Sequence, residues 1–393
     1  MGARQRPFKL GPVPGAGGME TAGTAARAGM YPDAAPPDVV LILAVATLMA
    51  IGVVMVLSSS YTRALSQFHD PYYFFKRQVV YAVAGWGLVA AIMRLDVQRL
   101  RAVAVPLMAL GYVLLAVVLA VGQEIGGSRR WISLPFVNLQ PSELAKLAAV
   151  NFAAFWAAQR PQAMGSFFRG PLVPLIAAGL AFGLIMLEPD FGTGVMLLFV
   201  VVVVLFAGGM KPGQLALLGV LILPVMGVLI WMEPYRMARL LAFIDPWADP
   251  AGRGWSVIQS LLAIGSGGLF GLGLGQSRQK FAYLPEHHTD FIFAILSEEL
   301  GWVGAVTVVV LFLIIAWRGY RIALGLEDPY EQLLAVGCVT LVVGQGLLNI
   351  GVVSGSLPVT GIPLPFVSYG GSSLMASMTA IGVLLKLSRH SVV

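Results

Sequence analysis

Ten apolar segments, each close to the length of a membrane-spanning helix, recur along this chain and decide what it can fold into. A helix needs about 20 apolar residues to cross about 30 Å of hydrocarbon. Backbone polar groups in lipid must bond within their own segment, so runs of this length form helices. The predicted spans are 39–58, 75–93, 103–122, 141–159, 171–187, 192–210, 213–232, 290–317, 331–353 and 369–387. The sequence therefore predicts an all-α, polytopic membrane protein with ten transmembrane helices.

The amino-acid composition lies outside the range of soluble globular proteins. Hydrophobic residues make up 58% of the chain and charged residues only 11%, and the mean hydropathy is +0.83. The single cysteine, Cys338, falls within an apolar span, which excludes a disulfide framework and a cysteine-based metal site. No glycine-rich phosphate loop of either nucleotide-binding type is present, so nucleotide binding is not expected.

The distribution of basic residues predicts how the chain is oriented. Residues 1–37 are rich in Gly, Ala and Pro and lack an apolar core, which predicts a disordered cytoplasmic tail ahead of a single transmembrane domain, 38–390. Placing this tail inside also places most Lys and Arg of the short loops inside, as cytoplasmic loops prefer. Both termini are then cytoplasmic, and nucleic acid is not an expected partner.

One predicted outer loop, 233–289 between spans 7 and 8, is far longer than the others. Its segment 235–244 has a helical pattern that places Arg236 and Arg239 on one stripe, which predicts an amphipathic helix on the outer membrane surface. These cations are candidates for binding a diphosphate, and nonspecific contact with anionic lipid headgroups is the alternative. The glycine-broken segment 254–274 is predicted to be interfacial or re-entrant. Its glycines allow the backbone to approach a ligand closely, and a flexible surface loop is the alternative.

The start of span 8 carries the acidic residue that stands out most. A polar segment broken by proline ends at Asp290, directly before the apolar run. An ionisable group so close to hydrocarbon is costly and therefore a functional candidate, although a capping Asp also belongs at a helix N-terminus. Glu298 and Glu299 lie two turns further on, so at least one should face the interior of the bundle. His287 and His288 adjoin Asp290 without a recognisable metal-binding pattern.

Three further polar clusters fall on the same predicted outer side. Glu143 and Lys146 are three residues apart at the start of span 4 and can pair on one helical face, as a functional or a purely structural ion pair. The carboxylates of the Glu188-Pro-Asp turn between spans 5 and 6 either belong to a functional site or are surface groups exposed to solvent. Ser368 and Ser372, next to two glycines, form either an oxyanion-binding helix N-terminus or a site of close helix packing.

Six motifs in order, GSRRWI, QPSELAK, EPDFGTG, KFAYLPEHHTDFIFA, EELG and GIPLPFVSYGGSS, resemble those of the SEDS family of bacterial membrane proteins, which includes RodA, FtsW and SpoVE. The resemblance covers about 39–390. It implies a ten-helix peptidoglycan glycosyltransferase that polymerises lipid II at the outer face of the cytoplasmic membrane. It also implies a partner, a class B penicillin-binding protein that acts as the transpeptidase. QPSELAKLA and PLPFVSYGGSS favour the RodA branch and hence cell elongation and shape, with division as the alternative.

The resemblance also implies roles for particular residues. Asp290 matches the family's essential acid, Glu143 and Lys146 match functional positions of the QPSE motif, and Arg130 and Trp131 match its conserved Arg-Trp pair.

The expected chemistry follows from the reaction. A carboxylate near the membrane surface can accept the proton of an attacking sugar hydroxyl, which makes Asp290 the candidate general base. The candidates for balancing the charge of the leaving diphosphate are Arg236, Arg239, Lys146 and Lys280. No cofactor is evident, although a divalent cation such as Mg²⁺ could assist.

Two functions of other classes compete with the enzyme: a lipid II flippase and a scaffold for the penicillin-binding protein. Transporters usually place ionisable groups on broken helices at the bilayer midplane, often in inverted repeats. Here the charged groups gather at the predicted outer ends of the spans, and no internal repeat is visible. A polymerase acting on a different prenyl diphosphate would explain the topology but not the motifs.

Overall fold

The computed structural model describes residues 36–125, 128–133, 138–281, 284 and 288–391. From Pro37 onward the described residues form one compact unit. The predicted disordered tail, 1–37, lies almost wholly outside the described residues and stays a prediction, as do His287 and Gly126 to Gly127 of the first motif.

Each of the ten predicted spans coincides with a helix. The helices are α2 (Val39–Phe68), α3 (Tyr73–Ile92), α5 (Ala104–Val121), α6 (Pro141–Gln159), α7 (Leu172–Leu187), α8 (Phe191–Ala207), α9 (Pro212–Trp231), α12 (Ile292–Leu324), α13 (Pro329–Val353) and α14 (Gly371–Ser388). Six of them, α2, α5, α9, α12, α13 and α14, are long and apolar enough to cross a membrane by length and composition, and α7 and α8 are shorter apolar helices. The all-α, polytopic class predicted from the sequence is confirmed.

Shorter elements connect these helices. They are α4 (Val97–Ala102), α10 (Pro234–Ile244), α11 (Trp255–Ser266), the 3₁₀ helices η1 (Pro161–Gly165) and η2 (Pro246–Ala248), and the antiparallel strands β1 (Gln123–Ile125), β2 (Ser128–Ser133) and β3 (Asn138–Leu139), paired in the order β1-β2-β3. The amphipathic helix predicted over 235–244 is therefore present as α10. The helix α11 is 12 residues long and occupies the first half of the glycine-broken segment.

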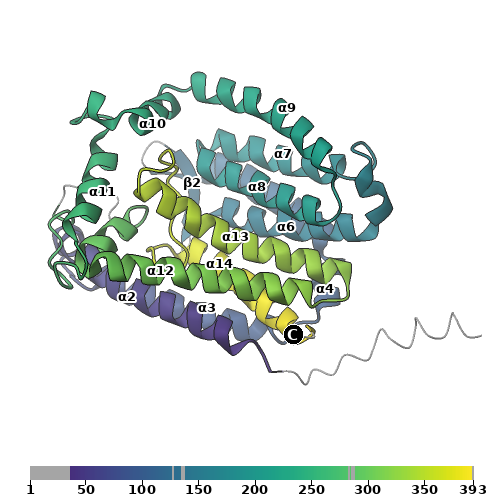
Figure 1. The fold of residues 1–393 in the computed structure, drawn as a ribbon, viewed down its shortest axis with the longest axis horizontal. Helices are drawn as coiled ribbons and strands as arrows, with labels where there is room; N and C mark the ends of the chain where they lie inside the picture. Colours follow the sequence, from purple (N-terminus) through teal and green to yellow (C-terminus); the bar gives the residue numbers. More distant parts are fainter. Residues whose placement is uncertain (1–35, 126–127, 134–137, 282–283, 285–287, 392–393) are drawn as a thin grey trace, which may run out of the picture. The chain divides into compact units, whose positions relative to one another are not determined.

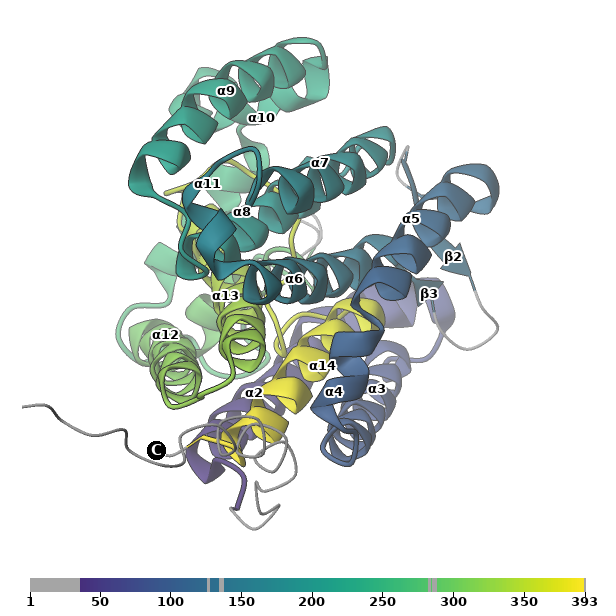
Figure 2. The ribbon, with the colours of Figure 1, turned by 90° about the vertical axis from the view of Figure 1, so that its right-hand side faces the viewer.

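The apolar helices pack around α13 and α14, which are the most deeply buried spans. Figure 1 shows α2, α12, α13, α8 and α9 lying one above another, and the neighbours in this order contact each other. Helix α6 packs on α13, α5 and α8, while α14 packs on α3 and α13. In the most apolar window of α14, 78% of the residues are buried, against 6% in α9. Helix α9 therefore lies at the margin of the bundle, as the end-on view in Figure 2 also shows.

Helix α12 is broken at Gly301, which has the backbone angles φ 68° and ψ −166°. The loop after α11 pairs with the broken turn, because Leu272 N–H donates to Glu298 O at 3.0 Å and Trp302 N–H donates to Gly268 O at 2.9 Å. A Cβ atom on residue 301 would lie 2.3 Å from the amide nitrogen of Gly271. The glycines here therefore allow two backbone segments of this chain to approach each other, where the sequence had suggested approach to a ligand or a surface loop.

The two ends of the bundle carry different polar groups. At one end the Arg318 guanidinium pairs with Asp38, whose backbone N–H donates to the Ser388 hydroxyl at 3.1 Å. The start of α2 and the end of α14 thus meet at the same end, as an even number of spans requires. The opposite end holds Asp290 and the segments around it, and we call it the Asp290 end.

Candidate functional site

A cavity of about 330 Å³ lies at the Asp290 end, under α10. It is lined by residues of α10, of the segment after η2, and of two loops that lead into and out of the bundle: Tyr235, Ala238, Arg239, Ala242, Gly252, Arg253, Ser256, Asp290, Phe291 and Val359. The candidate base thus shares one cavity with two guanidinium groups, those of Arg239 and Arg253.

The backbone around Asp290 is held by buried polar side chains from the end of α13 and the segment before α14. The Asn349 amide donates to Asp290 O and to Ile362 O, both at 2.7 Å. The Ser368 hydroxyl donates to Thr289 O at 2.6 Å. These bonds fix the backbone that carries Asp290, and a precisely oriented catalytic group needs such support.

A glycine with a positive φ lies next to the Asp290 carboxylate. Gly361 has a φ of +78°, and a Cβ atom there would lie 3.4 Å from Asp290 Oδ2 and 3.8 Å from the Arg239 guanidinium. A side chain at residue 361 would therefore be strained in its backbone, and its Cβ atom would lie in van der Waals contact with both charged groups.

Arg239 is oriented toward the same place by two contacts. Its guanidinium donates to Val359 O at 3.2 Å and lies 4.3 Å from the centre of the Tyr235 ring. Burial lowers the pKa of Arg239, and the charge of Arg130 acts in the same direction, whereas Tyr235, Asp290 and Asp190 raise it. The guanidinium stays protonated in any case. Asp290 and Arg239 therefore interact electrostatically, with Arg130 close enough to contribute.

Arg130 joins the β2 strand to the turn between α7 and α8. Its guanidinium donates to Glu188 O at 3.0 Å and to Pro189 O. Asp190 caps α8 by accepting from Thr193 N–H at 3.2 Å. Trp131, the partner of Arg130 in the first motif, is partly buried on the same strand. Arg130 thus fixes the turn between α7 and α8.

Glu188 is the most unusual carboxyl group of this turn. Its side chain is 0% exposed, and neither oxygen has a hydrogen-bond partner among the described residues. Burial, followed by the nearby charge of Asp190, raises its pKa to about 8, while Arg130 opposes the shift. Asp190 is also buried, at 3% exposure, so the interpretation of both carboxylates as solvated surface groups is wrong.

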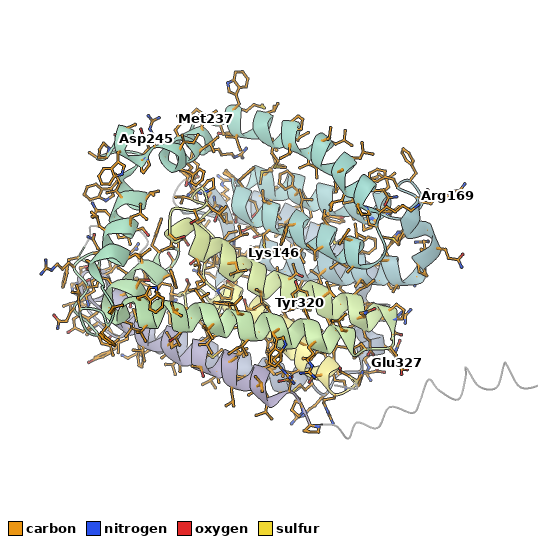
Figure 3. The ribbon with its side chains drawn as sticks, viewed as in Figure 1. Lys146, Arg169, Met237, Asp245, Tyr320 and Glu327 are labelled. Atoms are coloured by element: carbon orange, nitrogen blue, oxygen red, sulfur yellow. The ribbon has the colours of Figure 1, made fainter. Side chains whose placement is uncertain are left out.

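The predicted pair of Glu143 and Lys146 forms, but inside the bundle. Lys146 Nζ lies 3.0 Å from Glu143 Oε1 and 2.8 Å from Gln345 Oε1, and its side chain is 1% exposed. Figure 3 shows Lys146 within the helical array, away from Met237 and Asp245 at the edge. The pair links α6 to α13 and does not line the Asp290 cavity.

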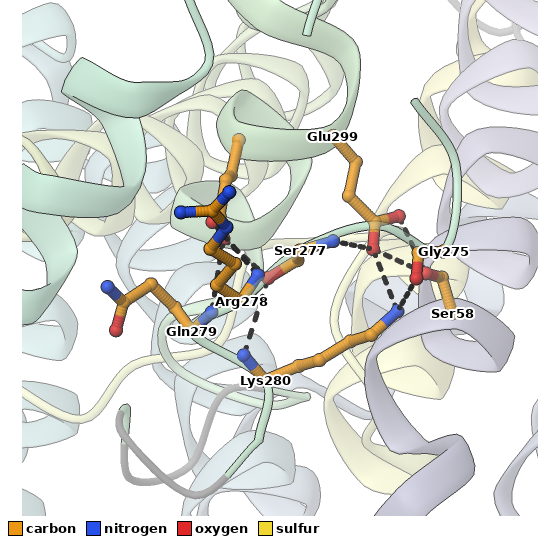
Figure 4. Close-up of polar contacts among 8 residues, drawn as sticks. Ser58, Gly275, Ser277, Arg278, Gln279, Lys280 and Glu299 are labelled. Atoms are coloured by element: carbon orange, nitrogen blue, oxygen red, sulfur yellow. Dashed lines mark hydrogen bonds and ion pairs between the residues drawn. The ribbon is translucent and has the colours of Figure 1, made fainter. Parts of the chain in front are cut away.

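Lys280 also finds a partner other than the one predicted for it. Its Nζ lies 3.2 Å from Glu299 Oε1 and donates to Gly275 O at 2.6 Å (Figure 4). Lys280 lines a separate cavity beside α2, together with Ser58. Four cations were predicted to balance the charge of a diphosphate. Arg239 lines the Asp290 cavity, and Arg236 lies one turn before it on α10. Lys146 and Lys280 are held in buried ion pairs.

Both glutamates of span 8 face the interior, as expected. Glu298 is 1% exposed and accepts from the backbone N–H of Arg278 at 3.0 Å, and Glu299 is 0% exposed and accepts from the Ser58 hydroxyl. They hold the 275–280 segment against α12 and α2 (Figure 4).

The hydroxyl groups of the two serines predicted to bind an oxyanion form hydrogen bonds with backbone groups. Ser368 donates to Thr289 O and accepts from Leu364 N–H. Ser372 donates to Asn138 O and accepts from Gln140 N–H at 3.0 Å. Neither lines the Asp290 cavity, and both tie neighbouring loops to the start of α14.

Sequence reasoning missed three residues that the fold brings to the site. Arg253 and Ser256 line the cavity, and Asn349 holds the backbone of Asp290. Asn349 could have been noticed as a polar residue near the end of an apolar span, where a partner is obligatory. Within the described residues, no three His, Cys, Asp or Glu side chains gather as metal ligands.

The comparisons with known proteins agree with this architecture. The family model for FtsW, RodA and SpoVE, described as cell cycle protein, matches residues 38–392. The chain belongs to this family. The stage V sporulation protein E of Bacillus subtilis is 44% identical over 357 residues, covering 90% of this chain and 98% of that protein. A probable peptidoglycan glycosyltransferase FtsW of Geobacter sulfurreducens is 40% identical over 353 residues, covering 89% and 95%.

Two solved structures share the fold. A chain from a peptidoglycan synthase complex, described for its coordination of polymerization and crosslinking, superposes with a TM-score of 0.74 at 34% identity, covering 90% of this chain and 98% of its own. RodA of Thermus thermophilus superposes with a TM-score of 0.67 at 30% identity, covering 92% and 100%. The resemblance to the SEDS family is confirmed. The preference for the RodA branch stays a prediction, because relatives named FtsW and SpoVE match as well.

Proposed function

We propose that this protein polymerises lipid II into peptidoglycan glycan strands at the outer face of the bacterial cytoplasmic membrane, with Asp290 as the general base. It is a multi-pass membrane protein and a glycosyltransferase of the FtsW, RodA and SpoVE family. The observation that carries the residue assignment is the shared cavity of Asp290, Arg239 and Arg253 at one end of the bundle. With that end outward, both termini lie in the cytoplasm.

The reaction needs one proton acceptor and a way to stabilise a leaving anion. The Asp290 carboxylate takes the proton from the acceptor sugar hydroxyl as the oxygen attacks C1 of the donor sugar. The bond from C1 to the diphosphate oxygen breaks, and the bonding pair leaves with the prenyl diphosphate. Arg239 and Arg253 lie in the same cavity and balance the added charge in the transition state.

Other predicted site residues support this geometry without touching the substrate. The buried pair of Glu143 and Lys146 braces α6 on α13, the helix that carries Asn349. Ser368 and Asn349 hold the backbone at residues 289 and 290. Arg130 holds the turn at Glu188, next to Arg239. We assign these residues to positioning, and a Mg²⁺ ion bound together with the substrate diphosphate would add to the charge balance.

We further propose that a class B penicillin-binding protein is the partner that crosslinks the product. The supporting observation is the likeness, at 34% identity, to a chain of a complex described as coordinating polymerization and crosslinking. In this proposal the present chain makes the glycan strands and the partner crosslinks them.

The decisive experiment measures lipid II polymerisation by purified protein in lipid nanodiscs, with and without the transpeptidase. Asp290→Asn removes the base while keeping the size of the side chain, and we expect at least a hundredfold loss of rate, in the range that a general base supplies. The control Asp70→Asn removes a partly exposed carboxylate that pairs with Lys76, and such surface pairs contribute little. A folded Asp290→Asn protein that polymerises at the parental rate would falsify the assignment. Movement of labelled lipid II between leaflets without polymer would favour the flippase instead.

A further inference from the structure

A second cavity, of about 510 Å³, lies between α8 and α9 and is lined only by apolar residues. From α8 it includes Phe191, Phe199 and Val202, and from α9 it includes Leu215, Gly219 and Met226. At about 1.5 Å per residue, the stretch of α8 from Phe191 to Val202 is about 16 Å long, roughly half the hydrocarbon thickness. We call this cavity the α8–α9 groove.

The groove exists because α9 packs poorly on the rest of the bundle. Of its twenty residues, Leu218 alone is buried, and Pro224 interrupts the hydrogen bonding within the helix. Figure 2 shows α9 beside α10 at the margin of the array, above α8. The apolar residues that line the cavity therefore leave space between α8 and α9 that an apolar chain from the membrane can occupy.

The Asp290 end of the groove is marked by a cation. Phe191, the first residue of α8, lines the groove, and the Arg236 guanidinium lies 5.8 Å from the centre of its ring. Arg236 donates to Leu229 O at 2.9 Å, which fixes the guanidinium near the last turn of α9. One helical turn further along α10, Arg239 lines the Asp290 cavity. The apolar groove and the charged cavity thus adjoin at α10.

We propose that the α8–α9 groove holds the prenyl chain of the substrate while its diphosphate lies at Arg236 and Arg239. The inference rests on the proposed function and deepens it by assigning a place to the lipid tail. The occupant that fits is an amphiphile with an apolar chain and an anionic head, because the lining of the groove is apolar and Arg236 lies at its Asp290 end. If the diphosphate head of the substrate lies in the Asp290 cavity, its prenyl chain enters the groove next to Arg236. This arrangement favours the prenyl diphosphate over an ordinary phospholipid.

Two glycines of α9 provide a matched pair of variants. A Cβ atom at Gly219, which lines the groove, would meet no atom within 4 Å, and the same holds for Gly227, which does not line it. Gly219→Trp therefore fills the groove without a backbone clash, and Gly227→Trp places the same ring on the same helix outside the groove. Thermal unfolding of both variants shows whether they fold alike.

The test compares the KM for lipid II with a full-length prenyl chain and with a chain of two isoprene units. For the long chain we expect Gly219→Trp to raise KM about tenfold, the effect of removing roughly two methylene groups from apolar burial. Gly227→Trp should stay within about twofold of the parental KM. For the short chain, which hardly reaches the groove, the two variants should agree. Equal KM values for the long chain in both variants overturn the groove assignment while leaving the polymerase function intact.

A binding measurement separates failure of the groove from failure of the proposed function. If the parental protein does not polymerise lipid II, the proposed function fails. In that case the groove alone is tested by native mass spectrometry, which measures whether the purified protein retains undecaprenyl diphosphate. Retention by the parental and Gly227→Trp proteins with loss in Gly219→Trp supports the groove. Equal retention by both variants, or loss of phosphatidylglycerol alone in Gly219→Trp, overturns it in favour of an ordinary membrane lipid.

Discussion

Replacing Glu188 by glutamine should stabilise the protein, and the gain should grow with pH. The Glu188 side chain is 0% exposed, and burial followed by the Asp190 charge raises its pKa from 4.5 to about 8. At pH 7 the folded protein therefore keeps this carboxyl protonated, whereas the unfolded chain ionises it. Glutamine has nearly the same shape and is neutral at every pH. It therefore avoids the free-energy cost of keeping the carboxyl group protonated in the folded state.

The size of the effect follows from the pKa difference between the two states. The folded state binds more protons than the unfolded state between pH 4.5 and about 8, so unfolding becomes easier as the pH rises through that window. One pKa unit corresponds to about 1.36 kcal/mol, which gives a penalty of about 3 kcal/mol at pH 7 and about 5 kcal/mol above pH 8. Below pH 4.5 both states are protonated and the penalty vanishes.

The assay is thermal unfolding in detergent, followed by tryptophan fluorescence from pH 4.5 to 9. We expect the melting temperature of Glu188→Gln to match the parental value near pH 4.5 and to exceed it increasingly toward pH 8, with no further increase above. Glu233→Gln removes an exposed carboxylate near the end of α9 and should show no such trend. A constant difference between Glu188→Gln and the parental protein at all pH values, or a Glu188→Gln protein that is less stable at pH 8, refutes the reasoning.

Two further predictions concern buried polar contacts. Lys146→Met should destabilise the protein by about 3–5 kcal/mol because it leaves Glu143 buried without its cation, whereas the double variant Glu143→Gln/Lys146→Met should recover most of that loss in the same thermal assay. No recovery in the double variant would contradict the pair. Asn349→Leu removes the two bonds to Asp290 O and Ile362 O, so kcat for polymerisation should fall about tenfold or more, while the KM for lipid II stays nearly unchanged. An Asn349→Leu protein that is folded and fully active would show that these bonds do not position the base.

The positions of the helices could be predicted from the sequence because the responsible physics is local. Lipid offers no hydrogen bonds, so each apolar run must satisfy its own backbone, and the ten predicted runs became ten helices. The ends were less well predicted, because α2 extends to Phe68 instead of residue 58 and α12 extends to Leu324 instead of residue 317. The same local reasoning identified α10 from its stripe of arginines and placed Asp290 before α12. The motifs added the family, which the match over 38–392 confirms.

The partners of the charged side chains were decided by the tertiary structure, because they depend on segments that are far apart in the chain. Lys280 and Arg239 are similar as cations in the same loop, yet Lys280 pairs with Glu299 and Arg239 lies with Asp290 in one cavity. The raised pKa of Glu188 and the groove beside α9 likewise arise from packing, since burial is a property of the assembled helices. The sequence by itself determined which segments enter the membrane and which residues carry charge. Only the folded bundle decided which charges lie in buried ion pairs between helices and which line the Asp290 cavity.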